Sequence, residues 1–192
     1  MCQNRLELLA DDPSLNESQV AEIGKTIDTL SYISRLNKSL LLLSKIENQQ
    51  FVEKTEIDIN QLVKQTLADL SEIYEHLHIE ARLTEQERLV THMDPALTAS
   101  LVTNLLKNAF VHNKEGGFVS IELKDNTLTV GNTGIEEALD AKAVFDTFYK
   151  KGDNANSSGL GLAIVKAICN GYGYFIKYQF IDNQHFFSIR FK

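Results

Sequence analysis

The first fifty residues follow a helical pattern of apolar positions. A short helix is predicted from Gln3 to Ala10, residues 11–14 interrupt it, and the cap-type residues 16–19 begin a second helix. The second helix carries a narrow apolar seam, which recurs at steps of three or four residues over about seven turns. Its members are Val20, Ile23, Ile27, Leu30, Ile33, Leu36, Leu40, Leu43 and Ile46. Such a hairpin either lies on its own domain or pairs with a second copy, and we favour pairing because the first helix is too short to cover the second.

From Phe51 onward the pattern alternates between strand and helix periods. Asn60 is expected to cap one helix, and Asp94-Pro95 to open another, because proline lacks only an N–H that a first turn leaves unpaired. Two hairpins are expected around the turns at 124–127 and 182–184. The expected strands span 51–59, 79–83, 89–92, 118–123, 128–130, 174–181 and 186–191. The pattern predicts an α+β fold, a two-layer α/β sandwich at 51–192 with a mixed sheet and helices on one face, after a helical hairpin at 1–50.

Composition narrows the function classes. The 192 residues are 43% hydrophobic, enough for one good core and a smaller helical appendage. The net charge of −7 argues against a nucleic-acid partner, which would require a basic stripe. Cys169 lies in an apolar helical pattern, so we expect a reduced core thiol, as suits a cytosolic compartment. No apolar run approaches the roughly 20 residues that cross a bilayer.

A glycine-bearing turn from Ser157 to Leu162 runs directly into an apolar helical pattern. Gly159 and Gly161 remove side chains where a backbone must approach another group closely, and the helix that follows offers N–H donors to an anion. This combination is typical of a phosphate cradle. It also occurs where a helix only packs tightly against its neighbour, so both interpretations stand for this segment alone.

Three segments upstream carry further candidate chemistry. Asn104, Asn108 and His112 are four residues apart, so they share one edge of a predicted helix, where amides can ligate a cation or bind phosphate. A solvated helix face is the alternative. The strand at 128–130 ends in a glycine turn at 131–135, and the segment 133–158 has the profile of a mobile lid. Its aromatic residues Phe145 and Phe148 equally suit a core.

Taken together and in this order, the four segments resemble the N, G1, F and G2 boxes of sensor histidine kinases, within the wider GHKL ATPase superfamily. The resemblance covers residues 51–192. The preceding helices, with Leu40 to Glu47, are similar to the end of a dimerisation and phosphotransfer hairpin.

The resemblance implies a set of nucleotide-binding residues. Asn108 would hold Mg²⁺, and Asn132 would take the place of the usual aspartate that accepts a hydrogen bond from the adenine amino group. Without the charge, adenine binding is expected to be weaker. Gly134 would let the backbone pass close to the base, Phe145 and Phe148 would anchor the lid, and Gly159, Leu160, Gly161 and Leu162 would wrap the phosphates. The remaining expected ATP contacts are Asn104, Lys107, His112, Ile135, Lys150 and Lys151.

Two absences refine the expected activity. Asn104 stands where gyrase-like and chaperone ATPases carry a carboxylate base, so ATP should be held for transfer rather than efficiently hydrolysed. The five histidines are His76, His78, His92, His112 and His185, all within 51–192. We therefore expect the phosphoacceptor histidine to lie N-terminal to Gln3, and no catalytic residue is assigned within the chain.

The resemblance also implies partners and location. It points to a histidine kinase that passes a phosphoryl group to the receiver domain of a response regulator. The full-length protein would form a homodimer through the helical hairpin and be anchored in the inner membrane, with this part in the cytoplasm. The alternative is a degenerate nucleotide-binding interaction module without kinase activity. Three features lend it weight: Asn132, the missing histidine of the helical segment, and Asn156-Ser157-Ser158, where the G2 box of the family often has a further glycine.

Overall fold

The structure is a computed structural model that describes residues 2–48, 50–51, 53–151 and 158–192. The chain divides into two compact units, Met1–Leu41 and Leu42–Lys192. The expected domain boundary at residue 50 stays a prediction. In the described part of the chain, no helix has both the length and the apolar content that crossing a bilayer requires.

The two N-terminal helices form where the apolar pattern predicts them. They are α1 (Cys2–Ala10) and α2 (Glu17–Glu47). Asn16 begins α2 with a reciprocal cap: its side chain accepts from the Gln19 amide at 3.0 Å, and the Gln19 side chain accepts from the Asn16 amide at 3.0 Å. Within the seam of α2, Leu43 and Ile46 are buried. Pairing with a second copy stays a prediction.

The second unit is built on a five-stranded sheet. The strands are β2 (Glu80–Glu85), β4 (Phe118–Lys124), β5 (Thr127–Asn132), β6 (Phe175–Ile181) and β7 (Gln184–Arg190), in the order β2-β4-β5-β7-β6. The strand β2 is parallel to β4 and the other neighbours are antiparallel. A separate antiparallel pair joins β1 (Thr55–Asp58) to β3 (Val90–Met93). The predicted mixed sheet is confirmed.

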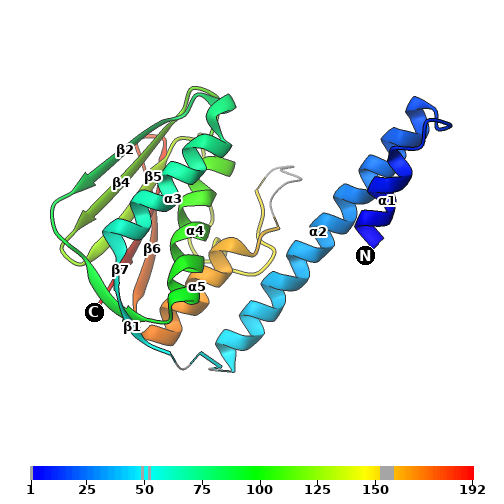
Figure 1. The fold of residues 1–192 in the computed structure, drawn as a ribbon. Coiled ribbons are helices and arrows are strands. Elements are labelled where there is room, and N and C mark those ends of the chain that lie inside the picture. The colour runs from blue at the N-terminus through cyan, green and yellow to red at the C-terminus, as the bar shows by residue number, and fades with distance from the viewer. Residues whose placement is uncertain (1, 49, 52, 152–157) are drawn as a thin grey trace. The chain divides into compact units, whose positions relative to one another are not determined.

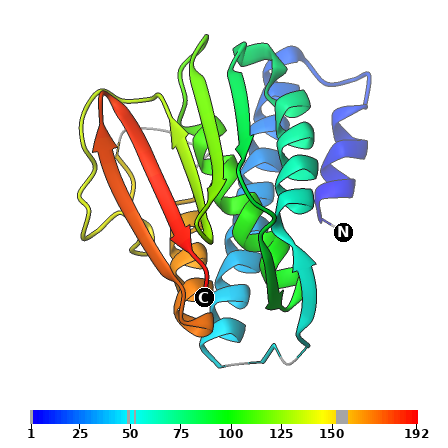
Figure 2. The ribbon, with the colours of Figure 1, turned by 90° about the vertical axis from the view of Figure 1, so that its left-hand side faces the viewer.

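Three helices cover one face of this sheet, as Figure 1 shows: α3 (Ile59–Ile73), α4 (Pro95–Val111) and α5 (Gly161–Tyr172), with the short η1 (Glu75–Leu77) after α3. Figure 2 shows the sheet from the side away from the helices. Phe110 of α4 and Phe187 of β7 are among the fully buried side chains of the core between these layers. The two-layer prediction is therefore confirmed.

Tight turns fix the register of the two hairpins. Asp125 and Asn126 join β4 to β5, and Asp182 and Asn183 join β6 to β7, all four with φ between 49° and 59°. Two consecutive residues with positive φ are typical of a type I′ turn, whose twist matches that of the flanking strands, and Asp and Asn tolerate this conformation better than other residues with side chains.

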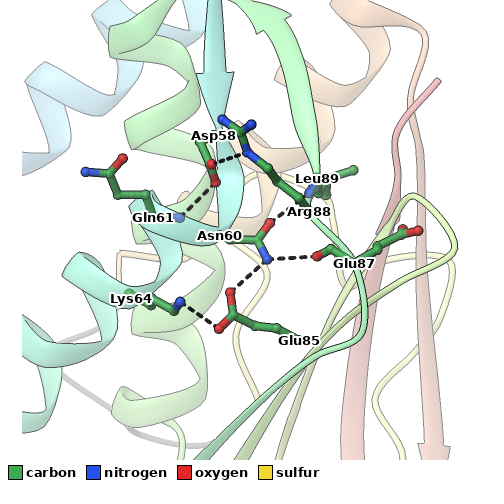
Figure 3. A network of polar contacts seen from close by, with 8 residues as sticks. All are labelled: Asp58, Asn60, Gln61, Lys64, Glu85, Glu87, Arg88 and Leu89. Carbon is green, nitrogen blue, oxygen red and sulfur yellow. Dashed lines mark hydrogen bonds and ion pairs between the residues drawn. The ribbon is translucent and has the colours of Figure 1, made fainter.

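The start of α3 differs from the sequence prediction. Asp58, and not Asn60, is the N-cap: its carboxylate accepts from the Gln61 amide at 3.1 Å and from Arg88 Nε at 2.8 Å. Asn60 lies inside the helix, and its amide reaches across to the loop between β2 and β3 (Figure 3). The sequence prediction failed because either residue can cap a helix, and only the position of the loop decides between them. The first strand is also shorter than expected and begins at Thr55.

The start of α4 agrees with the prediction. Asp94 is the N-cap, its carboxylate accepts from the amides of Ala96 and Leu97 at 2.9 and 3.0 Å, and Pro95 occupies the first helical position. This cap fixes where the helix begins, and so which residues of α4 face the turn before α5.

Candidate functional site

The amide row of α4, Asn104 and Asn108, lies close to the glycine turn at the start of α5, where Asn104 is next to Gly161. The Asn104 Nδ2 group donates to the Ser100 carbonyl at 2.8 Å, which leaves its Oδ1 directed at Gly161. A methyl group built on Gly161 would lie 3.2 Å from that oxygen. Asn108, one turn further along, is half-buried, and none of the hydrogen bonds among the described residues involves its side chain. Lys107 beside it is exposed.

The N-terminus of α5 differs from those of α3 and α4. Asp58 and Asp94 cap the earlier helices with carboxylates, whereas Leu160 is the N-cap of α5 and no side chain of the described residues caps it. The first turn of any helix leaves N–H groups without intrahelical partners. Leu160 is fully buried and Leu162 is half-buried, so the apolar side chains hold the turn. The Leu160 amide donates to the Ser158 hydroxyl at 3.3 Å, which leaves the amides of the following first turn of α5 as the candidate donors to an anion.

Gly159 shapes this turn. Its φ of +69° suits glycine, and a methyl group there would lie 2.8 Å from the Cα and carbonyl carbon of Phe148. The Phe148 amide donates to the Gly159 carbonyl at 2.8 Å. The backbones at 148 and 159 therefore hold the two ends of the intervening segment together.

A second group of residues gathers at the end of β5. Asn132 is 1% exposed, and its Nδ2 group donates to the Thr133 carbonyl at 2.6 Å. Its Oδ1 is buried and has no hydrogen-bond partner among the described residues. Gly134, two residues further on, packs closely against the backbone of residue 112: a methyl group on Gly134 would lie 2.6 Å from the His112 carbonyl oxygen. An unpaired buried acceptor is costly and requires an explanation.

Thr133 is held firmly between α4 and β4. Its hydroxyl donates to Asn113 Oδ1 at 2.6 Å and accepts from the Phe118 amide at 2.8 Å. Because the Thr133 carbonyl accepts from Nδ2, the Asn132 amide has a fixed orientation, with Nδ2 on the side of Thr133 and Gly134 and Oδ1 left unpaired. Within the protein Asn132 therefore donates through Nδ2, and its Oδ1 is the acceptor that stays open.

The segment between β5 and α5 is yellow in Figure 1. Of the two aromatic residues predicted to anchor it, only Phe145 does so through its side chain. Phe145 is buried and meets Phe187 edge-on, with ring centroids 6.2 Å apart. The Phe148 ring is 56% exposed and its φ is +65°, so it is the Phe148 backbone that anchors the segment. Part of the predicted lid, residues 152–157, lies outside the described residues.

The two lysines and Ile135 complete the predicted set. Lys151 Nζ donates to the Ala138 carbonyl at 3.0 Å and pairs with Glu137 at 2.9 Å, so it already has partners within the protein. Lys150 lies near enough to His112 for its charge to act on that imidazole. The Ile135 side chain is 44% exposed.

Burial disfavours the charged form of the histidine at this site. His112 caps the end of α4, and burial first, then the charges of His185 and Lys150, lower the pKa of its imidazole. Burial also raises the pKa of the Cys169 thiol to about 12, which fits the expected inert core thiol.

Sequence reasoning missed several residues that build the site. Thr133 accepts from the Asn132 amide and is held by Asn113, and His185, which contacts Tyr178, lies near Gly134. One signal was present: His185 alternates with Phe187 and Ile189, which places a polar ring on the inward face of a strand.

Known proteins resemble the chain in sequence and in fold. The family model described as "Histidine kinase-, DNA gyrase B-, and HSP90-like ATPase" matches residues 93–189. The heme sensor protein HssS of Staphylococcus saprophyticus is 31% identical over 177 residues, which are 85% of this chain and 36% of that protein. The chain thus spans little more than a third of the length of this curated relative.

Two solved structures share the fold. The histidine kinase AdeS of Acinetobacter baumannii matches 97% of this chain and 90% of its own, at 22% identity and a TM-score of 0.69. The histidine kinase ThkA, solved in complex with the response regulator protein TrrA, matches 97% of this chain and 54% of its own, at 21% identity and a TM-score of 0.68.

Proposed function

The chain belongs to the histidine kinase-, DNA gyrase B- and HSP90-like ATPase family, and on this premise we propose that it binds Mg-ATP for phosphoryl transfer to a histidine. The acceptor histidine would belong to a longer protein of which this chain is a part. The single observation that carries the proposal is the buried, unpaired Oδ1 of Asn132, two residues before Gly134. An adenine amino group supplies the donor that this oxygen lacks.

The phosphate end fits the same ligand. The turn from Gly159 to Leu162 would offer its backbone N–H groups other than that of Leu160 to the phosphates, and the exposed Lys107 would add a mobile positive charge. Asn108 would hold Mg²⁺ through its side-chain oxygen, a ligand type that Mg²⁺ accepts. Bound Mg²⁺ would neutralise charge on the transferring phosphoryl group.

The residues of α4 favour transfer over hydrolysis. Asn104 lies beside Gly161, one turn before Asn108, and its amide has no basicity with which to activate water. The protein would orient ATP and leave the γ-phosphoryl group for an external nucleophile. The complex of ThkA with a response regulator supports a receiver domain as the next partner of the phosphoryl group.

The test is a titration with a non-hydrolysable ATP analogue, with and without Mg²⁺. We expect Mg²⁺ to strengthen binding by the native chain and to have little effect on Asn108→Ala. Asn170→Ala is the matched control, because this exposed asparagine lies nine residues beyond Gly161 on α5, about 13 Å along the helix. Equal weak binding by all three proteins, with no response to Mg²⁺, would overturn the proposal.

A further inference from the structure

A five-residue segment directly after Gly134 is tied to the sheet by two side chains. We call this segment, Ile135–Leu139, the strap. The Leu139 amide donates to the Tyr178 hydroxyl at 2.9 Å, and His185 Nε2 lies 2.8 Å from the Ile135 carbonyl oxygen. Tyr178 and His185 contact one another, with the hydroxyl 2.9 Å from Nδ1. The two side chains therefore bind both ends of the strap.

Backbone groups fix the direction of the two outer hydrogen bonds in this chain. A backbone N–H only donates, so the Tyr178 oxygen accepts from Leu139. A carbonyl only accepts, so Nε2 of His185 carries the proton that reaches Ile135. With the imidazole neutral, Nδ1 carries no proton and accepts from the Tyr178 hydroxyl, so one tautomer satisfies all three bonds. In agreement with this, burial lowers the pKa of His185.

The same imidazole lies behind the residues assigned to the base. His185 on β7 is the register partner of Asn132 on β5, and its Cδ2 would lie 3.6 Å from a methyl group built on Gly134. The ring is 3% exposed and stacks on Tyr178, with centroids 5.9 Å apart. A shift of the strap therefore moves the backbone that follows Asn132.

We propose that Tyr178 and His185 are positioning residues for the nucleotide site: they hold the strap against the sheet and so keep Gly134 where it receives the base. This inference rests on the proposed nucleotide binding. Neither side chain needs to touch the ligand, because the effect passes through the strap backbone.

Several groups surround His185, and they determine how its protonation would affect the strap. Tyr178 and Phe180 face it from β6, the charge of Lys151 acts on it from the segment before α5, and His112 lies across Gly134 on α4. A second proton on Nδ1 would leave the Tyr178 hydroxyl without its acceptor. ATP binding should therefore weaken as His185 becomes protonated at acid pH.

The test compares two tyrosine-to-phenylalanine variants of the whole chain. Tyr178→Phe removes the hydroxyl that binds the strap. Tyr174→Phe removes a hydroxyl that pairs with Thr91 at 2.6 Å in a different cluster, and so controls for the general loss of a partly buried tyrosine bond. We expect Tyr178→Phe to bind the ATP analogue about three- to tenfold more weakly, the size of one lost hydrogen bond, and Tyr174→Phe to bind it normally.

Hydrogen exchange provides a readout that does not require a ligand. In Tyr178→Phe without nucleotide, the Leu139 amide should exchange faster than in the native chain, while Tyr174→Phe leaves it unchanged. His185→Gln keeps a donor for Ile135, so its affinity should lie between those of the native chain and His185→Ala. The acid-side decrease in affinity should be smaller in His185→Gln than in the native chain.

The outcomes separate the two proposals. If the native chain binds no nucleotide, the proposed function fails and this inference fails with it. If the native chain binds nucleotide but Tyr178→Phe matches Tyr174→Phe in affinity and in exchange, only the inference is overturned. Faster exchange at Leu139 with unchanged affinity would also overturn it, because the strap would then move without affecting the site.

Discussion

Two buried asparagines in this domain do different work. Asn60 on α3 is 8% exposed and uses its whole amide: Nδ2 donates to Glu85 at 2.8 Å and to the Glu87 carbonyl at 2.9 Å, and Oδ1 accepts from the Leu89 amide at 2.8 Å (Figure 3). Asn132 at the end of β5 is 1% exposed, donates to the Thr133 carbonyl, and leaves Oδ1 without a partner among the described residues.

The two asparagines differ in whether all hydrogen-bonding atoms of the side-chain amide have partners. The cluster around Asn60 binds a loop to a helix and leaves no acceptor of that amide unpaired, so a structural role accounts for its burial. The cluster around Asn132 is just as buried but retains one oxygen whose desolvation nothing among the described residues offsets. Buried polarity alone therefore does not mark a binding site. An unpaired buried acceptor at the end of a strand, two residues before a glycine that admits no side chain, does.

The largest expected effect comes from replacing each asparagine with alanine. Asn60→Ala leaves the Leu89 amide and the Glu87 carbonyl unpaired, so we expect the free energy of unfolding to fall by about 2–4 kcal/mol with the affinity of the folded protein for ATP unchanged. Asn132→Ala should show the reverse pattern, with affinity reduced about tenfold or more and a smaller loss of stability. Urea unfolding and calorimetric titration measure the two quantities.

The comparison breaks if both variants lose stability and affinity in parallel. Asn132 would then be a structural residue like Asn60, and its unpaired oxygen would have no functional meaning.

Gly134→Ala is expected to have the second largest effect. The new methyl group would lie 2.6 Å from the His112 carbonyl, which belongs to the backbone and cannot rotate away. We expect a cost of about 1–3 kcal/mol, shared between stability and ATP affinity. Gly171→Ala on α5 is the control, because nothing lies within 4 Å of its methyl position. Normal affinity in Gly134→Ala, measured by titration, would contradict the assignment of the base end.

Local chemistry predicted most of the fold. The two helices of the first unit, the Asp94-Pro95 start of α4 and both hairpin turns follow from caps, periodicity and turn residues that act over a few positions. The wrong prediction of Asn60 as the N-cap of α3 arose because local chemistry did not distinguish the two candidate residues. Asp58 and Asn60 are both good caps, and contacts with a loop near residue 88, 30 positions away, decided the outcome.

The site was predictable only in part for the same reason. The amide row and the glycine turn were visible because each lies within one short segment, and the structure brings Asn104 next to Gly161. The bond between Tyr178 and His185 depends on how β6 pairs with β7, and the exposure of Phe148 depends on a positive φ that its residue type does not favour. Neither follows from spacing along the chain.

Acid should destabilise the two clusters in different pH ranges. Burial lowers the folded-state pKa of His185 below its ordinary 6.5, so between these values the unfolded state binds more protons, and stability declines as pH falls below about 6.5. In the Asn60 cluster, the contact with Lys64 lowers the pKa of Glu85 below 4.5, and its contribution is lost only as pH falls from about 4.5.

Unfolding measured from pH 7.5 to 4 tests this separation. His185→Gln should reduce the decline in the upper range, where His112 contributes in the same direction, and leave the lower range unchanged. An identical profile in the native chain and His185→Gln would show that His185 has the same pKa in both states.

The smallest expected effect comes from Gly161→Ala at the phosphate end. The new methyl group would lie 3.2 Å from Asn104 Oδ1, a side-chain atom that can move by a few tenths of an ångström, so we expect ATP affinity to fall only about two- to threefold. Alanine is also the better helix former, and stability should be equal or higher by up to about 1 kcal/mol, as in Gly171→Ala, which should keep full affinity. The experiment compares the affinity losses of Gly161→Ala and Gly134→Ala. The methyl group at 134 meets a backbone carbonyl, whereas the one at 161 meets a side-chain amide that can rotate. Equal losses of affinity at 134 and 161 would mean that the phosphate end is as rigid as the base end, and that Asn104 is held in place by more than its bond to Ser100.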